Sequence, residues 1–251
     1  MRRRTSAEEL DARIKSGDRT FIQWLRSAER RNELNTLTRP TRRFIAAYLR
    51  KVLTGVAAPT LVLNIGCGFG GQAATVAKVQ SRLVHYVGMD HDPECVRRSR
   101  QQYGGLSTIQ FQPIDYLVPP KLPRKFDYII VSDVLASLPG YQQLLSNLWQ
   151  RCNAALIATF PEPLVLDRGS DSLTLDTQER RLYCQWSADR LMEFAGRIAP
   201  CVDSFTVFGD TGEGRDHVVA LRQSDKVQPL TGIHRAADPA VTFPFYIQGL
   251  Q

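Results

Sequence analysis

The sequence predicts an α/β fold, in which helices cover both faces of a mostly parallel sheet and further helices precede it. Short apolar segments alternate with helical segments between residues 60 and 160. Strands that are apolar along their whole length are typical of parallel sheets buried on both sides. After residue 200, two strand-like segments are joined by a Gly-rich link too short for a crossover helix. That link predicts an antiparallel hairpin at the edge of the sheet.

Length and composition exclude several classes of protein. The 251 residues allow one sizeable α/β domain and an appendage. Because no run of about 18 apolar residues occurs, we expect neither a transmembrane helix nor a membrane partner. The start "MRRRTSAEEL" is basic but lacks the apolar segment of a signal peptide, and the five cysteines form no C-x-x-C pair. We therefore expect reduced thiols in a cytoplasm, without a disulfide framework or a metal site.

The N-terminal fifth carries the excess positive charge and has helical periodicity. Residues 1–51 contain fourteen Arg and Lys against six Asp and Glu, whereas the whole chain has a net charge of +7. Ser6 and Glu9 have the spacing of a capping box, and apolar residues recur at helical spacing after Asp18 and after Pro40. We expect residues 1–56 to form a basic helical region without strands.

The remaining elements follow in a regular order. Strands are expected over 60–65, 83–90, 108–114, 128–133 and 155–160, with helices over 70–79, 93–103 and 141–152 between them. Residues 204–208 and 217–222 are the strands of the predicted hairpin. These elements define a predicted domain over 57–223. Residues 224–251 contain three prolines without periodicity, which indicates an extended C-terminal tail.

A glycine cluster follows the first strand, where ligands bind in open parallel sheets. The segment "GCGFGG" fits G-x-G-x-x-G through Gly66, Gly68 and Gly71, and G-x-G-x-G through Gly66, Gly68 and Gly70. The helix that follows offers unpaired N–H groups to a pyrophosphate or to the carboxylate of an amino-acid-like ligand. Dinucleotides and S-adenosylmethionine are both compatible with this loop, and so is a turn that binds nothing.

Two acids distinguish these ligands. Asp90 ends the second strand and could accept both ribose hydroxyls, because Asp92 before Pro93 is the better cap for the next helix. Asp115 ends the third strand and could accept the adenine amine, although it could also be a turn residue. A dinucleotide site does not require the second acid. No Y-x-x-x-K pair or other constellation for hydride transfer occurs, so S-adenosylmethionine is favoured.

With these segments in order, residues 60–222 resemble the class I S-adenosylmethionine-dependent methyltransferase family. The resemblance is carried by "VLNIGCGFG", "YVGMDHDP", "IQFQPIDYL", "FDYIIVSDVLASLP", the segment from Trp186 to Phe208, and "HVVALR". It implies a Rossmann-like seven-stranded sheet with an antiparallel last strand, and direct transfer of a methyl group from S-adenosylmethionine. The implied cofactor-binding residues are Asn64, Gly66, Gly68, Gly70, Asp90, His91, Asp115, Tyr116 and Ser132.

Asn64 departs from the family pattern, which has Asp or Glu two residues before the first glycine. In the family that acid orients the amino group of the methionine moiety. Asparagine can still accept a hydrogen bond through its carbonyl oxygen, but it contributes no negative charge. Weaker cofactor binding is therefore expected, and loss of activity is an alternative.

Residues for the acceptor are expected after the fourth and fifth strands. Asp133 is the candidate catalytic residue that orients or deprotonates the acceptor, or else it caps the next helix. Glu162 follows the fifth strand, and residues 163–186 form a long polar insertion that contains Arg181 and Tyr183. Long connections are often binding loops, so these three residues are candidate acceptor contacts, although solvated surface is the alternative.

The acceptor itself stays open between two main classes. In the first, the acceptor is a small molecule methylated on oxygen or nitrogen, and the N-terminal helices cover its pocket. In the second, the acceptor is RNA bound by the basic N-terminal region. A protein- or carrier-bound acceptor and a cofactor-binding protein without catalysis are further alternatives. The candidate phosphate contacts are Arg2, Arg3, Arg4, Arg30, Arg31, Arg42 and Arg43.

Overall fold

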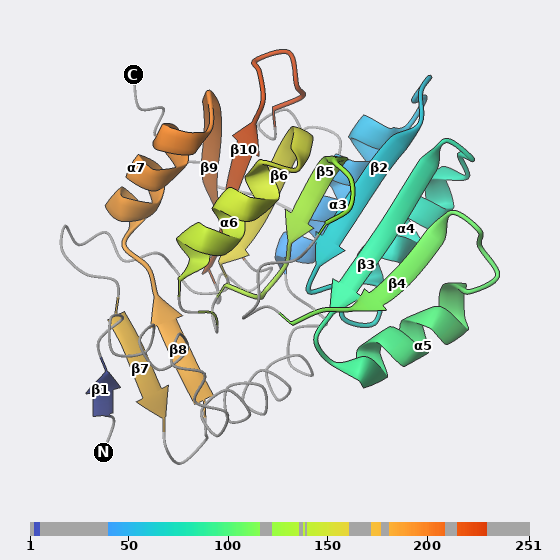
Figure 1. The fold of residues 1–251 in the computed structure, drawn as a ribbon. Coiled ribbons are helices and arrows are strands. Elements are labelled where there is room, and N and C mark those ends of the chain that lie inside the picture. Colours follow the sequence, from blue (N-terminus) through green and yellow to red (C-terminus); the bar gives the residue numbers. More distant parts are fainter. Residues whose placement is uncertain are drawn as a thin grey trace.

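Seven strands form the central sheet of the computed structural model. They are β2 (Thr60–Ile65), β3 (Val84–Asp90), β4 (Ile109–Pro113), β5 (Phe126–Val131), β6 (Cys152–Phe160), β9 (Cys201–Phe208) and β10 (Arg215–Arg222). Their order in space is β4-β3-β2-β5-β6-β10-β9 (Figure 1). Only β10 runs against its neighbours, since it pairs antiparallel with both β6 and β9. The predicted seven-stranded sheet with an antiparallel last strand is thus confirmed.

The structure describes residues 3–5, 40–115, 122–135, 138, 140–160, 172–176, 181–208 and 215–229. The helices expected after Ser6 and Asp18 lie outside these residues, as does most of the predicted C-terminal tail. Within the described part of the chain, no helix is both long enough and apolar enough to cross a membrane.

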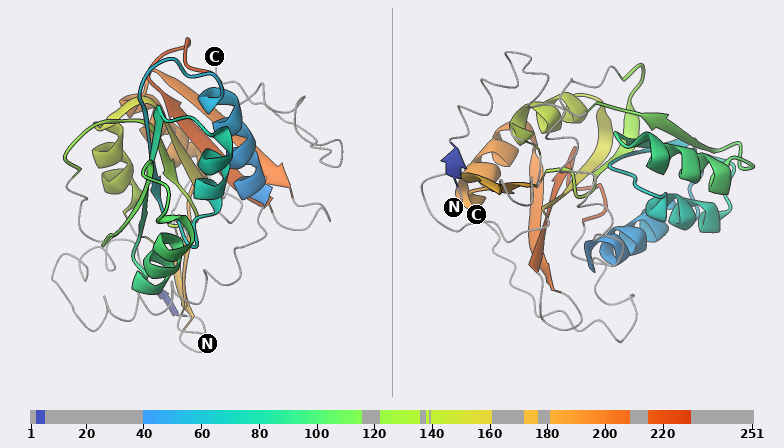
Figure 2. Two further views of the ribbon diagram at one scale, coloured as in Figure 1. Left: turned by 90° about the vertical axis from the view of Figure 1, so that its right-hand side faces the viewer. Right: turned by 90° about the horizontal axis from the view of Figure 1, so that it is seen from below.

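Two layers of helices enclose the sheet (Figure 2). Three helices cover one face, namely α3 (Pro40–Leu53), α4 (Gly71–Val79) and α5 (Pro93–Tyr103), and two cover the other, namely α6 (Tyr141–Trp149) and α7 (Ala188–Ile198). The amphipathic pattern after Pro40 forms α3 as expected, and Ile45, Tyr48 and Leu49 on its apolar face are completely buried in the same core as β2. Each such side chain contributes about 1.5–3 kcal/mol by burial. Helix α3 is therefore an integral part of the sandwich, while the boundary proposed at residue 56 stays a prediction.

A second, small sheet contains β1 (Arg3–Thr5), β7 (Ser172–Asp176) and β8 (Arg181–Gln185), in the order β1-β7-β8. Figure 1 shows it on the side toward which β2, β3 and β5 point. The expectation that the N-terminal region contains no strand is wrong at Arg3–Thr5, because three residues have no periodicity to reveal a partner about 170 residues away. The polar insertion likewise contains an antiparallel hairpin, β7–β8.

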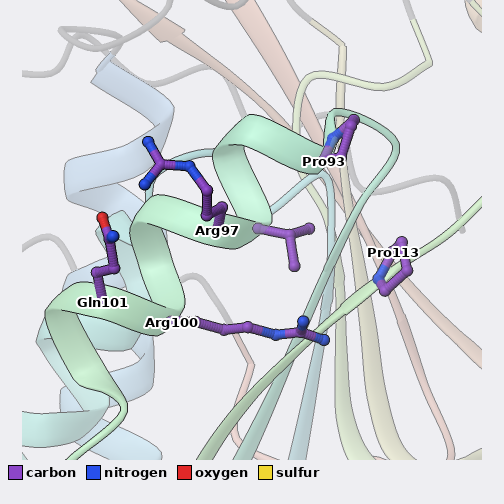
Figure 3. A pocket seen from close by; sticks show the side chains of 6 residues that line it. Pro93, Arg97, Arg100, Gln101 and Pro113 are labelled. Atoms are coloured by element: carbon purple, nitrogen blue, oxygen red, sulfur yellow. The ribbon is translucent and has the colours of Figure 1, made fainter.

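The outer edge of β4 is occupied by α5. The backbone N–H of Ile114 donates to Asp90 of β3, and alternation along the strand turns the carbonyl of Phe111 to the open edge. Arg100 donates two N–H groups to that carbonyl, from Nε at 2.9 Å and from Nη2 at 2.7 Å. Figure 3 shows its side chain reaching from α5 to the strand. Pro113 at the end of β4 has no N–H to offer.

Candidate active site

The strand order arranges the predicted site residues in a row along the carboxyl ends of the parallel strands. Asp115 follows β4, Asp90 ends β3, Asn64 is the penultimate residue of β2, and Ser132 and Asp133 follow β5. From the neighbouring strands β2 and β5 the chain winds in opposite directions, with helices on opposite faces. This reversal point is where open α/β sheets bind their ligands.

Gly66 starts the glycine loop in a conformation and a space that only glycine tolerates. Its φ is +76°, and a Cβ atom there would overlap the carbonyl oxygen of Ser132 and lie 2.5 Å from Cγ2 of Val134. Gly68 also has a positive φ, but a Cβ there would meet no atom within 4 Å among the described residues. Gly70 leads into α4 without a side-chain cap, so the first N–H groups of the helix face the loop side. The loop thus leaves room for a ligand against bare backbone.

Asp90 fastens this loop from the neighbouring strand. It is completely buried, and its Oδ2 accepts from the N–H of Gly68 at 2.8 Å while Oδ1 accepts from the N–H of Asp92 at 3.0 Å. Burial by itself raises the pKa of Asp90, but hydrogen bonds from His91 and from these two N–H groups outweigh it and lower the pKa. Asp92 caps α5 by accepting from Glu94 at 2.9 Å, as predicted. Asp90 therefore has a structural task as well, and its role toward a ribose stays a prediction that the remaining lone pairs of its oxygens permit.

Three buried oxygens near the loop have no hydrogen-bond partner among the described residues: Asn64 Oδ1, Gln72 Oε1 and Ser132 Oγ. The other end of the Asn64 amide donates to the hydroxyl of Tyr86 at 3.0 Å. Because buried polar atoms are almost always hydrogen-bonded, a group of such oxygens indicates a place for a ligand with donors. Sequence reasoning missed Gln72, although its position in the first turn after the glycines could have indicated it.

Asp133 is clamped between two elements beside this group. Its φ is +56°, its N–H donates to Oγ1 of Thr159 on β6 at 2.9 Å, and the same hydroxyl lies 3.4 Å from its Oδ1. Its Oδ2 forms an ion pair with Arg42 of α3 at 3.4 Å, and the carbonyl of Arg42 accepts from Gln72 at 3.1 Å. Sequence reasoning placed Arg42 among candidate RNA contacts and did not identify Thr159. A non-glycine residue in this conformation is typical of sites that hold a side chain in one position.

The other predicted residues are only partly within the described structure. Asp115 is half-buried, and the Nδ1 atom of His91 lies 3.3 Å from Asp90. Tyr116 and Glu162 lie outside the described residues, and Arg181 and Tyr183 belong to β8 with side chains that are not described. The roles of all these residues stay predictions.

A pocket of about 370 Å³ opens between α5 and the end of β4 (Figure 3). Its lining residues are Pro93, Val96, Arg97, Arg100, Gln101 and Pro113. None of the predicted cofactor residues is among them. The pocket therefore lies beside the row of site residues.

Comparison with known proteins agrees with the fold and the loop. Residues 63–154 match a family model described as a methyltransferase domain. No curated protein matches the sequence. Residues 63–154 therefore carry a methyltransferase domain, and the order of the strands around the glycine loop agrees with a Rossmann-like fold.

Among solved structures, similarity extends beyond the matched segment. The magnesium protoporphyrin IX methyltransferase of Synechocystis PCC 6803 with bound S-adenosylhomocysteine is 19% identical, with a TM-score of 0.55 over 73% of this chain and 82% of that one. The N-terminal domain of EvdMO1, in the presence of S-adenosylhomocysteine and D-fucose, is 14% identical, with a TM-score of 0.55 over 72% and 82%. An S-adenosylmethionine-dependent methyltransferase of Clostridium acetobutylicum ATCC 824 is 8% identical, with a TM-score of 0.54 over 75% and 94%. At these identities the likeness shows a shared fold.

The residues of the row fit S-adenosylmethionine in their chemistry. The ligand carries an adenine amine, two ribose hydroxyls, an ammonium and a carboxylate. Acceptors occur in sequence along the row. The oxygens of Asn64 and Gln72 that have no partner within the described part of the chain are carbonyl oxygens, which can only accept. The first N–H groups of α4 suit a carboxylate.

Proposed function

We propose that this chain transfers the methyl group of S-adenosylmethionine directly to an oxygen or nitrogen of a small-molecule acceptor, with Asp133 as the catalytic residue. The observation that carries the proposal is the clamped carboxylate of Asp133 at the end of β5, next to the oxygens of Ser132 and Asn64 that have no partner among the described residues. When bound, S-adenosylmethionine supplies an electrophilic methyl group, so that a C–S bond breaks as a C–O or C–N bond forms and S-adenosylhomocysteine remains.

The chain's own residues then contribute position and proton transfer. Alignment of two reactants in one site can contribute about 7–11 kcal/mol to the lowering of the barrier. Asp133 accepts a hydrogen bond from the O–H or N–H of the acceptor and takes its proton as the new bond forms. Arg42 and Thr159 hold the carboxylate in one orientation, because the first pairs with Oδ2 and the second contacts Oδ1.

Two observations favour a small molecule over RNA. Arg42, one of the candidate phosphate contacts, is directed at Asp133 and only 24% of its side chain is exposed. Helix α3, which carries it, packs against the sheet with its whole apolar face. In addition, one structural neighbour is named as a methyltransferase of a porphyrin, and another was crystallised in the presence of D-fucose.

The test uses the full chain with methyl-labelled S-adenosylmethionine and a cell extract separated into a low-mass filtrate, RNA and protein. We expect label in the filtrate, and mass spectrometry of the labelled compound then identifies the acceptor. Asp133→Asn should lower the transfer rate about 100-fold, which is the low end for loss of a general base. Its affinity for S-adenosylhomocysteine should be unchanged, and exposed Asp189→Asn is the control with the same change of charge.

Label in RNA would replace the small-molecule proposal by the RNA alternative. Binding of S-adenosylhomocysteine without label in any fraction would favour a cofactor-binding protein without catalysis. Full activity of Asp133→Asn would remove Asp133 from the mechanism.

A further inference from the structure

The amino ends of the parallel strands form the edge of the sheet opposite the row of site residues (Figure 1). Strands β4, β3, β2, β5 and β6 start there side by side, over about 19 Å at the usual spacing of neighbouring strands. The described segments that lead into these strands are 54–59, 80–83, 104–108, 122–125 and 150–151. They contain no Asp or Glu, and their cations, all exposed, are Arg82, Arg124, Lys125 and Arg151.

Two helices add three cations to the same edge. Helices α3 and α4 end here, because each leads directly into a strand that starts at this edge. Their last turns carry Arg50, Lys51 and Lys78, and all three side chains are exposed. These three residues and the four in the preceding segments are called the basic edge below.

Few acids offset the charge of the basic edge. Asp127 of β5 lies close to it, but this residue is half-buried and its Oδ2 accepts from the N–H of Leu61 at 2.8 Å. After β10 the chain returns to this end of the sheet with Asp225 and Lys226, whose charges cancel. The basic edge therefore has a net positive charge that attracts an anionic surface.

Two apolar side chains lie among these cations. Leu83 and Leu106, 37% and 42% exposed, are the two exposed large hydrophobic residues of the described part of the chain. Leu83 directly precedes β3, and Leu106 lies in the segment before β4, the neighbouring strand. Apolar side chains beside cations are typical of surfaces that bind a lipid bilayer, where the apolar groups leave water and the cations meet phosphate.

The leucines favour a lipid surface over a nucleic acid. Cations alone would attract either, but proteins that bind single strands stack the bases on aromatic rings. Among the side chains that the structure describes, no Phe, Tyr or Trp is exposed. An insertion of leucine side chains has a counterpart in the bilayer and none in a phosphate backbone.

We propose that the basic edge docks this chain on the surface of an anionic lipid bilayer, with Leu83 and Leu106 entering the headgroup region. The inference goes beyond the proposed function, because the basic edge contains no site residue and lies at the other end of the strands. A chain docked in this way keeps its site turned away from the bilayer. The lack of a long apolar segment predicts no membrane partner, whereas surface binding needs no such segment.

The test measures the partition coefficient of the full chain by sedimentation with lipid vesicles. The vesicles contain phosphatidylcholine alone, or phosphatidylcholine with about 30% of the anionic lipid phosphatidylserine. We expect binding to the anionic vesicles only. Raising the ionic strength from about 0.01 M to about 0.15 M shortens the Debye length from about 30 Å to about 8 Å, so the partition coefficient should fall about tenfold.

Two double variants locate the contact, at about 0.1 M salt, where charges act over about 10 Å. Arg82→Gln with Lys125→Gln removes two charges of the basic edge. Each cation near an anionic surface contributes about fivefold to partitioning, or about 1 kcal/mol, so this variant should bind about 25-fold more weakly. Arg43→Gln with Arg190→Gln is the matched control, because both arginines are exposed near the starts of α3 and α7, away from the basic edge. It should lose less than about twofold.

Leu83→Asn with Leu106→Asn tests the apolar part and should weaken binding about tenfold while leaving its salt dependence unchanged. An equal loss in the Arg43 and Arg190 control would mean that net charge alone attracts the chain. Full binding of the leucine variant would mean that no side chain enters the bilayer. Binding of polyuridylate through the same cations, without binding to vesicles, would assign the basic edge to nucleic acid. Each of these results overturns the proposal.

Vesicle binding can be separated from folding and from the proposed function. The six substituted side chains are exposed, so each variant should keep the melting temperature of the unaltered chain. Because vesicle binding requires no cofactor, its absence leaves the proposed methyl transfer intact. Likewise, absence of methyl transfer leaves the docking proposal intact.

Discussion

Replacing Asp90 by Asn should lower the free energy of unfolding, because Asp90 fastens the glycine loop. The carboxylate accepts one N–H from Gly68 and one from Asp92, and it is completely buried. The NH₂ group of Asn64 has an acceptor in the hydroxyl of Tyr86. An asparagine at position 90 would instead direct its NH₂ group toward one of two backbone N–H donors. A hydrogen bond to a charged group is worth about 1.5–3 kcal/mol, so we expect the free energy of unfolding to fall by about 2 kcal/mol. For a chain of this size that corresponds to a melting temperature lower by about 4–8 °C.

The pH dependence provides the decisive assay. The folded-state pKa of Asp90 lies below its ordinary value of 3.8, so its contribution to stability is complete above that pH and is lost as the pH falls through the lowered pKa. Urea unfolding should therefore show a full difference between the two proteins near neutral pH and a shrinking one below pH 3.8. Asp92→Asn is the control, because asparagine caps a helix as well as aspartate does. An equal loss in the control, or a difference that persists in acid, would refute the reasoning.

Three further predictions concern stability. Gly66→Ala should prevent stable folding or lower the melting temperature by more than any other substitution here. Gly71→Ala should be tolerated, because a Cβ there meets nothing within 4 Å among the described residues. Equal melting temperatures of the two variants would contradict this prediction. Burial lowers the pKa of His217 to about 4, so the unfolded chain binds its proton first and stability should decline as the pH falls below 6.5. The decline is at most about 1.4 kcal/mol per pH unit, and His217→Gln should flatten it in acid-unfolding curves. Thr41→Val removes a 2.9 Å hydrogen bond to buried Asp216 and should cost about 1–3 kcal/mol in urea unfolding. Thr54→Val is the control and should cost less, because it removes an exposed hydrogen bond to the carbonyl of Arg50.

The parallel part of the sheet was predictable because each of its elements carries a local signal. The apolar strand before Gly66 is buried on both faces, and the Asp92–Pro93 pair marks the start of α5. Likewise, the short Gly-rich link after residue 208 predicted a pair of antiparallel strands, and the structure shows this pair as β9 and β10. The glycines at the end of β2 predict where the candidate site lies, because glycines let a ligand approach the backbone closely. The roles of the individual site residues stay predictions.

Contacts between distant segments were not predictable in this way. Arg42 and Asp133 are 91 residues apart, and no periodicity links them. The partner of Asn64 lies 22 residues away on a strand whose alternation gives burial but not pairing. The sequence indicated that Asp92 caps the next helix and that Asp90 therefore has another role. It could not show that the carboxylate of Asp90 accepts from the N–H of Gly68.

The way in which Arg100 and Pro113 terminate the sheet has a consequence for assembly. At Phe111, a neighbouring chain that approached β4 would find the outward carbonyl engaged by a fork of two N–H groups and, two residues on, no donor at all. Edge strands left open invite such additions, and a guanidinium that bonds to the edge discourages them. Association of two copies through the β4 edge would first have to displace Arg100 from the carbonyl of Phe111.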